Sequence, residues 1–250
     1  DQANQLGAKY IATGHYANIH EKNGYFYLKK GTDPLKDQSY VLWGIPTHTL
    51  SRTLFPLGKH TKKEVRKIAL ENKLETANIP DSMEICFVAD NNYKRFLKDY
   101  VPNKMNAVGK GNIKNETGQN IGQHEGYPNY TIGQRKGLGI SNSEPLYVTK
   151  IEPKNNQIVV GKKETLYESK CNMSQVNWLV KQKNTHFEVL AQIRYNSPLV
   201  PAEIRLINGQ HEIHFQSPQM AITPGQSIVF YNGDVVLGGG IIEKAIGNDE

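Results

Sequence analysis

Residues 226–243 read QSIVFYNGDVVLGGGIIE, two apolar runs that flank an Asn-Gly pair at 232–233. An Asn-Gly pair in this setting is a strong signal for a tight β-hairpin. The same signal recurs at 208–209 inside AEIRLINGQHEIHF, and FEVLAQIRY at 187–195 alternates apolar and polar residues as a half-buried strand does. Several short strands with such turns predict a small closed barrel or a sandwich, and we favour a C-terminal β-barrel over residues 167–250.

The front of the chain, residues 1–92, mixes helix and strand. DQANQLGAKYIATGHYA at 1–17 reads as the end of a helix, a glycine and then a buried strand. This is one half of a repeating α/β unit, so we expect the chain to begin inside a domain. Asn23-Gly24 predicts another hairpin, and Thr61 with Glu64 three residues later forms a capping-box pattern that predicts a helix.

The middle, residues 93–166, has the composition of a separate small domain. The spacing of Tyr93, Phe96, Leu97 and Tyr100 predicts a short amphipathic helix. Residues 101–145 are rich in Gly, Asn and Gln, which predicts loop and short β-structure. LYVTKIEPKNNQIVVG, which follows, predicts two short strands joined by a Pro-Lys-Asn-Asn turn.

Bulk composition limits the function classes. The 250 residues carry 30 Lys and Arg against 24 Asp and Glu, a net charge of +6 that permits a polyanionic partner but also fits an ordinary basic surface. No apolar run approaches the ~18 residues of a membrane span and no leader pattern opens the chain, so we expect a cytoplasmic protein without a membrane partner. The two cysteines are too far apart for a CxxC pair, which leaves any thiol chemistry to one reduced sulfur.

Two polar clusters in the front part are candidate binding residues. Gly14 and His15 follow the first apolar run, at the place where a parallel strand ends and a nucleotide can approach the backbone. A turn glycine and a structural histidine are the alternative. Lys36, Asp37 and Gln38 stand together in KDQSY, which is also compatible with a solvated loop.

Further candidates lie in the middle and in the barrel. Gln134, Arg135 and Lys136 stand between glycines and offer donors for phosphates, although an ordinary basic turn is equally compatible. Arg194 beside Tyr195 pairs a guanidinium with an aromatic plane, which suits a phosphate and a base, or else a surface arginine next to a core tyrosine. Cys86 in PDSMEICF is by composition a small buried hydrophobe as readily as a reactive thiol.

The order of these motifs resembles a known family. ATGHYA, KDQSYVL, DSMEICF, GYPNYTIGQRKGLGI, IRYNSP and TPGQSIVFYNGDVVLGGGIIE follow one another as in the tRNA-specific 2-thiouridylases of the MnmA type. The resemblance covers essentially the whole chain. It implies an α/β plus β fold: the C-terminal part of an ATP-pyrophosphatase-type nucleotide-binding domain (1–92), a small central tRNA-binding domain (93–166) and a C-terminal β-barrel (167–250).

The resemblance also implies a reaction. Enzymes of the family use ATP, with Mg, to adenylate the C2 oxygen of the wobble uridine of tRNAs for Lys, Glu and Gln. A cysteine persulfide then supplies sulfur, loaded by a sulfur-relay protein or a cysteine desulfurase. Cys86 matches the persulfide carrier and Gly14 the ATP-contacting glycine, whereas Cys171 matches no catalytic residue. The residues that match tRNA contacts are His15, Lys36, Asp37, Gln38, Arg194, Tyr195 and, less securely, Gln226.

Departures from the family pattern qualify this reading. The family's SGGxDSS phosphate loop and its second catalytic cysteine should lie before residue 1, so we expect the chain by itself to be inactive in thiolation. An RNA-binding module without catalysis is the alternative, and an ATP-pyrophosphatase that activates a small carbonyl substrate is a more distant one. We also expect residues 81–90 to rearrange when tRNA docks, because the adenylate must be shielded from water.

Overall fold

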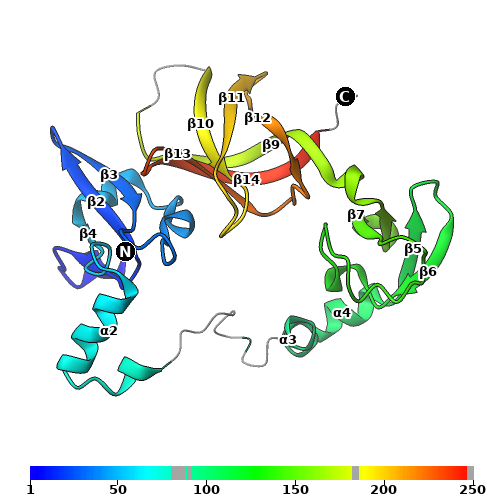
Figure 1. Cartoon of the computed structure of the whole chain (residues 1–250), viewed down its shortest axis with the longest axis horizontal. Helices are drawn as coiled ribbons and strands as arrows, with labels where there is room; N and C mark the ends of the chain where they lie inside the picture. Colours follow the sequence, from blue (N-terminus) through cyan, green and yellow to red (C-terminus); the bar gives the residue numbers. More distant parts are fainter. Residues whose placement is uncertain (80–87, 89–91, 182–185, 247–250) are drawn as a thin grey trace. The chain divides into compact units, whose positions relative to one another are not determined.

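The computed structural model describes residues 1–79, 88, 92–181 and 186–246 (Figure 1). The chain forms two compact units. The first contains residues 1–79, 169–217 and 224–250, and the second contains residues 80–168 and 218–223. The front part of the chain and most of the barrel therefore share one unit.

The first unit opens with α1 (Gln2–Gln5) and β1 (Ile11–Ala12). β1 pairs in parallel with β4 (Thr53–Leu54), so the predicted α/β character is present. The prediction that this strand is buried is wrong, because both of its residues are exposed. The reason is that β4 is its one partner among the described residues, so β1 has a neighbour on a single side.

A hairpin of β2 (Ala17–Lys22) and β3 (Tyr25–Lys30) follows. Asn23 and Gly24 both have positive φ, 54° and 77°, as a two-residue hairpin turn demands, which confirms the prediction. One face of the hairpin carries Ala17 and Leu28, both fully buried in the core of the unit.

The remaining front elements connect the hairpin to the helix that the capping box predicts. Two short 3-10 helices, η1 (Ser39–Leu42) and η2 (Thr47–Arg52), precede β4, and a third, η3 (Glu75–Asn78), follows α2. α2 (Lys62–Glu71) begins where it was predicted. The Thr61 side chain accepts from Glu64 N–H and the Glu64 carboxylate accepts from Thr61 N–H, so both bonds of the capping box are made.

The rest of the first unit is a closed six-stranded barrel, as predicted (Figure 1). Its strands are β9 (Tyr167–Trp178), β10 (His186–Gln192), β11 (Val200–Ile207), β12 (Gln210–Met220), β13 (Ser227–Asn232) and β14 (Val235–Ile246). They pair in the order β13-β10-β11-β12-β9-β14, and the β13–β14 pairing closes the ring. The hairpin joins the barrel where Lys29 lies opposite Val235.

Local turns fix the register of the barrel. Asn208 and Gly209 form the predicted two-residue turn between β11 and β12, with φ of 51° and 80°. At the other Asn-Gly pair, Asn232 pairs with Val235 and the turn residues are Gly233 and Asp234. That turn therefore lies one residue later than predicted, with Gly233 at φ 57°.

The second unit contains a small sheet and two short helices. Its elements are α3 (Tyr93–Tyr100), α4 (Pro102–Val108), β5 (Gly111–Asn115), β6 (Asn120–His124), η4 (Tyr127–Asn129), β7 (Tyr147–Glu152), η5 (Pro153–Asn155), β8 (Gln157–Gly161) and η6 (Lys163–Leu166). The strand order is β6-β5-β8-β7, and Ile113, Val148, Ile158 and Val160 are fully buried between the sheet and its loops.

Three predictions for the second unit can be compared with it. The helix over Tyr93–Tyr100 and the two strands around the Pro153 turn are confirmed. The loop prediction is wrong at α4, which Pro102 begins at its first turn and Gly109, at φ 60°, ends. Pro in the first turn and Gly after the last are themselves helix-boundary signals, so the composition of the whole stretch concealed a short local pattern.

Candidate functional site

The turn after β1 holds Gly14 and His15. The Thr13 hydroxyl lies 2.9 Å from His15 Nδ1, and the His15 ring meets the Phe55 ring edge-on with 6.2 Å between centroids. Gly14 is exposed, and a Cβ added there would meet Leu57 at an ordinary 3.7 Å. Packing within the described chain therefore does not require glycine here, and the backbone stays open to a close-fitting ligand.

Gln38 ties the KDQ segment to this turn. Its side-chain Oε1 accepts from Tyr16 N–H at 3.0 Å, and its own backbone N–H donates to the Tyr16 carbonyl at 2.9 Å. Tyr16 directly follows His15. The structure thus brings together two motifs whose bonded residues are 22 positions apart in the sequence.

Asp37 organises the same segment through its carboxylate. Oδ1 accepts from Gly31 N–H at 2.9 Å and from Ser39 N–H at 3.1 Å, and Oδ2 accepts from the Ser39 hydroxyl at 2.9 Å. Ser39 is fully buried, and its Oγ lies 3.2 Å from the hydroxyl of Tyr231 on β13. Burial raises the pKa of Tyr231 above its usual range. The polar chain from Asp37 to Tyr231 fastens the KDQ segment to the barrel.

Lys36 stands at the start of this segment. It is half-buried, and its backbone N–H donates to the Asp33 carbonyl at 3.1 Å. The Asp33 carboxylate accepts from Leu35 N–H at 3.0 Å and from Lys62 N–H at 2.9 Å, which links the loop to the first turn of α2. The loop that carries Lys36 is therefore held at Asp33, which accepts hydrogen bonds from three backbone N–H groups.

A cavity of about 570 Å³ lies beside the KDQ segment, inside the first unit. Asp37 and Tyr40 line it from the front part, and Tyr195 lines it from the loop between β10 and β11. The Tyr40 and Tyr195 rings lie 6.0 Å apart between centroids at an angle of 52°. The sequence-predicted residues Asp37 and Tyr195 are thus brought to one cavity. Its other lining residues are Lys30, Pro34, Leu35, Gln192, Asn196, Ser197 and Leu199.

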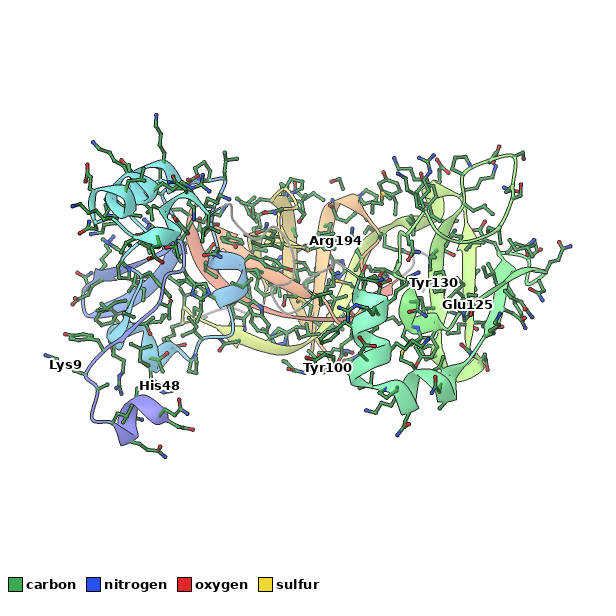
Figure 2. The ribbon with its side chains drawn as sticks, turned by 90° about the horizontal axis from the view of Figure 1, so that it is seen from below. Lys9, His48, Tyr100, Glu125, Tyr130 and Arg194 are labelled. Atoms are coloured by element: carbon green, nitrogen blue, oxygen red, sulfur yellow. The ribbon has the colours of Figure 1, made fainter. Side chains whose placement is uncertain are left out.

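Arg194 and Tyr195 lie on a loop that is held in shape by Ser197. The Ser197 hydroxyl accepts from Arg194 N–H at 3.2 Å and donates to the Arg194 carbonyl at 3.0 Å. Figure 2 shows the Arg194 side chain beside the barrel strands. Burial raises the pKa of Tyr40 to about 12, although the charge of Arg194 acts in the opposite direction. Tyr195 is 47% exposed, which leaves its ring accessible to a ligand.

Gln226 is held near the same region by the hydrogen bonds of its neighbour Ser227. The Ser227 carbonyl accepts from the Tyr40 hydroxyl at 2.7 Å, and the Ser227 hydroxyl accepts from Trp43 Nε1–H at 3.0 Å. Gln226 itself is half-buried and its carbonyl accepts from Ile242 N–H at 2.9 Å. It adjoins the site without being one of the residues that line the cavity.

Sequence reasoning missed Tyr40 and Lys30 as members of the site. Tyr40 stands two residues after Gln38, so a KDQ motif extended by two residues would have included it. Lys30 ends β3, and its Nζ lies 4.7 Å from the centre of the Tyr231 ring. A lysine over an aromatic face is a stabilising pair that the sequence alone does not reveal.

The structure describes one of the two cysteines. Cys86 and the segment 81–90 that we expect to rearrange fall largely among residues 80–87 and 89–91, outside the described part of the chain. Cys171 lies in β9, fully buried, and desolvation raises the pKa of its thiol from 9.0 to about 12. A thiol with so high a pKa carries no thiolate at neutral pH, so Cys171 is a core residue, in agreement with the prediction.

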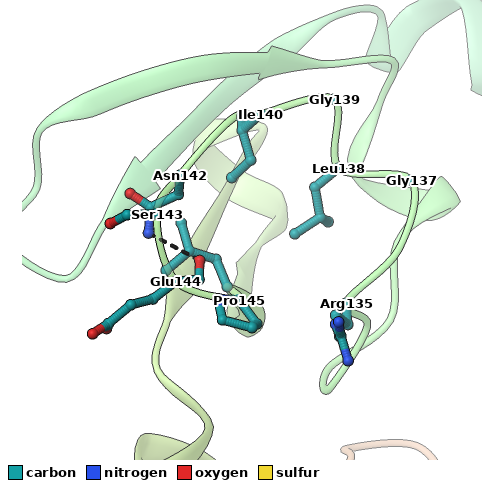
Figure 3. A pocket seen from close by; sticks show the side chains of 10 residues that line it. Arg135, Gly137, Leu138, Gly139, Ile140, Asn142, Ser143, Glu144 and Pro145 are labelled. Carbon is teal, nitrogen blue, oxygen red and sulfur yellow. Dashed lines mark hydrogen bonds between the residues drawn. The ribbon is translucent and has the colours of Figure 1, made fainter.

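In the second unit, Gln134, Arg135 and Lys136 lie in a turn in which the Gln134 side chain makes hydrogen bonds within the protein. The Gln134 side chain accepts from Thr131 N–H at 3.0 Å and donates to the Lys136 carbonyl at 2.9 Å. Arg135 is exposed and lines a cavity of about 360 Å³, with Leu138 and Ile140 between it and Glu144 (Figure 3). Gln134 therefore shapes the turn, and the exposed side chains of Arg135 and Lys136 remain available to a phosphate.

Two classes of site do not occur in the described residues. No group of three or more His, Cys, Asp and Glu side chains is placed to hold a metal ion there. None of the helices within the described ranges has the length and apolar character needed to cross a bilayer.

Comparisons with known families match most of the chain. Residues 1–90 match the family described as the tRNA methyl transferase HUP domain, residues 94–162 the tRNA methyl transferase PRC-barrel domain, and residues 168–242 the aminomethyltransferase beta-barrel domain. Together with the fold, these matches define a three-part protein in which a HUP-type α/β domain precedes two β-rich domains. The predicted fold class is confirmed.

Individual relatives identify a particular family within this class of three-part proteins. The chain is 46% identical to the tRNA-specific 2-thiouridylase MnmA of Halothermothrix orenii, over 97% of this chain and 68% of the relative. It is 44% identical to the protein of the same name from Carboxydothermus hydrogenoformans, over 98% of this chain and 67% of the relative. The MnmA protein of Chlorobium chlorochromatii is 46% identical over 97% of the chain. The chain belongs to the family of tRNA-specific 2-thiouridylases of the MnmA type.

Proposed function

We propose that the protein is a tRNA uridine 2-sulfurtransferase, which replaces the C2 oxygen of the wobble uridine with sulfur in tRNAs for Lys, Glu and Gln. The observation that supports this most is the match of all three parts of the chain to one family, with relatives named as 2-thiouridylases at 42–46% identity. These matches favour the enzyme over an RNA-binding module without catalysis. We also propose that the domains divide at 1–92, 93–166 and 167–250, and that the protein acts in the cytoplasm.

ATP, with Mg, is the proposed cosubstrate. The fit rests on the exposed backbone at Gly14, where an added Cβ would meet Leu57 alone among the described residues, at an ordinary 3.7 Å. When bound, ATP supplies the adenyl group that makes the C2 oxygen of uridine a leaving group. The chain's own contribution at this point is the close approach of the Gly14 backbone, with His15 directed to the tRNA beside it.

Recognition of tRNA is assigned to the cavity and its neighbours. Arg194 supplies a guanidinium for a phosphate and Tyr195 a ring on which a base can stack. Lys36 adds a second cation. Asp37 and Gln38 use their side chains for internal hydrogen bonds, so their role in tRNA binding includes holding the loop in the shape that presents its neighbours. Gln226 is proposed as a further contact at the edge of the site.

Cys86 is proposed to carry the sulfur as a persulfide, accepted from a sulfur-relay protein or a cysteine desulfurase. In one route its outer sulfur attacks C2 and expels AMP, and a partner thiolate then attacks the inner sulfur of Cys86, breaks the S–S bond and leaves the outer sulfur on C2. In the other route the partner thiolate first releases the outer sulfur as sulfide, which attacks C2 and expels AMP. Both routes end with a disulfide between the partner cysteine and Cys86. A reductant then resets that disulfide. A thiolate needs an electropositive setting at neutral pH, so nearby Lys or Arg side chains are part of this proposal.

Single-turnover sulfur transfer to tRNA, with radiolabelled sulfur on the full-length protein, tests the assignment. Cys86→Ser should abolish transfer, and Cys171→Ser, the matched control at the buried cysteine, should retain it. Loss with Cys171→Ser and retention with Cys86→Ser would overturn the role given to Cys86. No transfer by the unmodified protein from any persulfide donor would overturn the enzyme itself.

A further inference from the structure

The outer face of the β2–β3 hairpin places basic side chains beside tyrosines. The register pairs Asn18 with Lys29, His20 with Tyr27 and Lys22 with Tyr25. These six residues, here termed the hairpin face, point away from the core, because Ala17, Ile19, Phe26 and Leu28 on the opposite face pack into it. Over the four residue steps of β2 the row extends ~13 Å.

Most of the hairpin face has no partner within the described chain. Tyr25 is 64% exposed, and neither tyrosine hydroxyl makes a hydrogen bond to a described residue. His20 and Lys22 are exposed and likewise make no ion pair there. Lys29 and Asn18 are the exceptions: Lys29 Nζ lies 2.9 Å from the Asp234 carboxylate, and Asn18 Nδ2 donates to the Lys30 and Gly58 carbonyls, each at 3.0 Å. An exposed lysine and an exposed histidine beside two accessible rings are more than a stable hairpin needs.

Two hollows border the hairpin face. One of about 380 Å³ is lined by His20, Lys29 and the exposed Lys59, and its one carboxylate, Asp234, is the partner of Lys29. Lys59 makes no ion pair with a described residue, so the hollow is net cationic. The other, of about 1060 Å³, lies past the tyrosines and is lined by aromatic and basic side chains: Tyr25, Phe26, Tyr27, His48, Trp178 and Lys181.

The hairpin face is continuous with the candidate site. Lys30 lines both the cationic hollow and the cavity that holds Asp37, Tyr40 and Tyr195. β3 itself runs directly into the loop that carries the KDQ segment. A ligand that fills the cavity can therefore extend along the hairpin without leaving the surface of the first unit.

We propose that the hairpin face binds an unpaired stretch of the tRNA, with backbone phosphates at Lys59, His20 and Lys22 and bases stacked on Tyr25 and Tyr27. Cations that follow a backbone, interleaved with rings on which bases stack, are the recurring chemistry of single-stranded nucleic-acid binding. A protein partner with an acidic surface would satisfy the cations but gives no reason for the tyrosine pair. The inference rests on the proposed function, since it takes tRNA as the ligand.

Equilibrium binding of unmodified tRNA across a salt series tests the proposal with the full-length protein. Lys22→Ala combined with Lys59→Ala should lower the magnitude of the slope of log K against log salt by about two, roughly one for each phosphate that a lysine no longer neutralises. Tyr25→Ala should weaken binding about tenfold at every salt concentration with the slope unchanged, and Tyr25→Phe should restore it. Lys63→Ala, an exposed lysine on α2, is the matched control and should leave affinity and slope unchanged.

Three outcomes would overturn the proposal. The first is that the double lysine variant and Tyr25→Ala both bind tRNA with the wild-type affinity and salt slope. The second is that Lys63→Ala reduces the slope as much as the double lysine variant does. The third is that the hairpin variants bind tRNA normally but lose sulfur transfer from a protein donor. The last would make the hairpin face a protein-docking surface. Single-turnover thiolation separates this test from the proposed function, because the Lys63→Ala control should proceed at the wild-type rate and failure of thiolation in the unmodified protein would count against the function alone.

Discussion

Gln38 and Tyr16 are joined by two hydrogen bonds, one from the Tyr16 N–H to the Gln38 side chain at 3.0 Å and one from the Gln38 N–H to the Tyr16 carbonyl at 2.9 Å. The pair connects the KDQ segment to the turn that holds Gly14 and His15. The role of Gln38 in binding cannot be inferred from its position in the KDQ motif alone, because loss of its side chain changes the shape of the site as well as any contact with a ligand.

Replacement of Gln38 should therefore affect stability and binding together. Gln38→Ala leaves the Tyr16 N–H without its acceptor and should lower the free energy of unfolding by about 1 kcal/mol, measured by urea denaturation. Gln38→Glu keeps an oxygen acceptor for that N–H and should retain the stability. If the amide also touches tRNA, Gln38→Glu should bind tRNA more weakly at wild-type stability. Equal stability of Gln38→Ala and wild type would show that the hydrogen bond does not hold the turn.

The buried hydrogen bonds of Ser39 give a second prediction. Ser39→Ala removes the donor to Asp37 and the partner of the Tyr231 hydroxyl, and should cost about 2 kcal/mol because buried polar groups are left unpaired. Tyr231→Phe removes one end of the chain and should cost about 1 kcal/mol. The double variant should cost less than the sum of the two, since both changes break one interaction. Additive losses in denaturant titrations would contradict a coupled chain.

Short-range patterns were enough for much of the fold. The capping box at Thr61 and Glu64 and the turn at Asn23-Gly24 involve residues within one turn of each other, so the local sequence determines them. The barrel followed from repeated strands and turns. The exposure of β1 could not be predicted in this way, because burial of a strand depends on neighbours that the local sequence does not contain.

The site shows the same limit at longer range. The motifs that carry Asp37 and Tyr195 were identified from the sequence through their resemblance to a family, but their meeting at one cavity depends on how the barrel closes. Ser39 and Tyr231 are in contact across 192 residues of sequence, and no local signal marks either as the partner of the other. The internal use of the Asp37 carboxylate is visible only once Gly31 and Ser39 are placed around it.

Tyr195 should contribute to tRNA binding through its ring. Tyr195→Ala should weaken tRNA binding about tenfold, since base stacking on an aromatic side chain is worth roughly that much, and Tyr195→Phe should bind as wild type. Fluorescence anisotropy with labelled tRNA measures both. Tyr167→Ala is a suitable control, because Tyr167 is similarly exposed at 41% but begins β9 and is not one of the residues that line the cavity. A Tyr195→Phe variant as weak as Tyr195→Ala would assign the effect to the hydroxyl instead.

Burial of Cys171 predicts how stability depends on alkaline pH. Its thiol has a pKa of about 12 in the folded protein against 9.0 when exposed, so above pH 9 the unfolded chain releases a proton that the folded chain keeps. Folding is then opposed by ionisation, and the free energy of unfolding should fall as the pH rises from 9 toward 12, by at most ~1.4 kcal/mol per pH unit from this group. Tyr40, whose pKa is raised from 10.0 to about 12, adds to the fall above pH 10.

The interval between pH 9 and pH 10 separates the two groups, because the Cys171 thiol ionises first in the unfolded chain, whereas Tyr40 ionises there only as the pH approaches its ordinary pKa of 10.0. Cys171→Ala should flatten the decline of stability in that interval, and Tyr40→Phe should flatten only the part above pH 10. Urea titrations at steps of half a pH unit, in a Cys86→Ser background that removes the other thiol, measure both slopes. Alkylation gives an independent check: Cys171 should resist iodoacetamide at pH 8 in the native protein and react once urea unfolds it. Rapid native alkylation, or a wild-type slope in Cys171→Ala, would mean that the thiol is not confined to the barrel core.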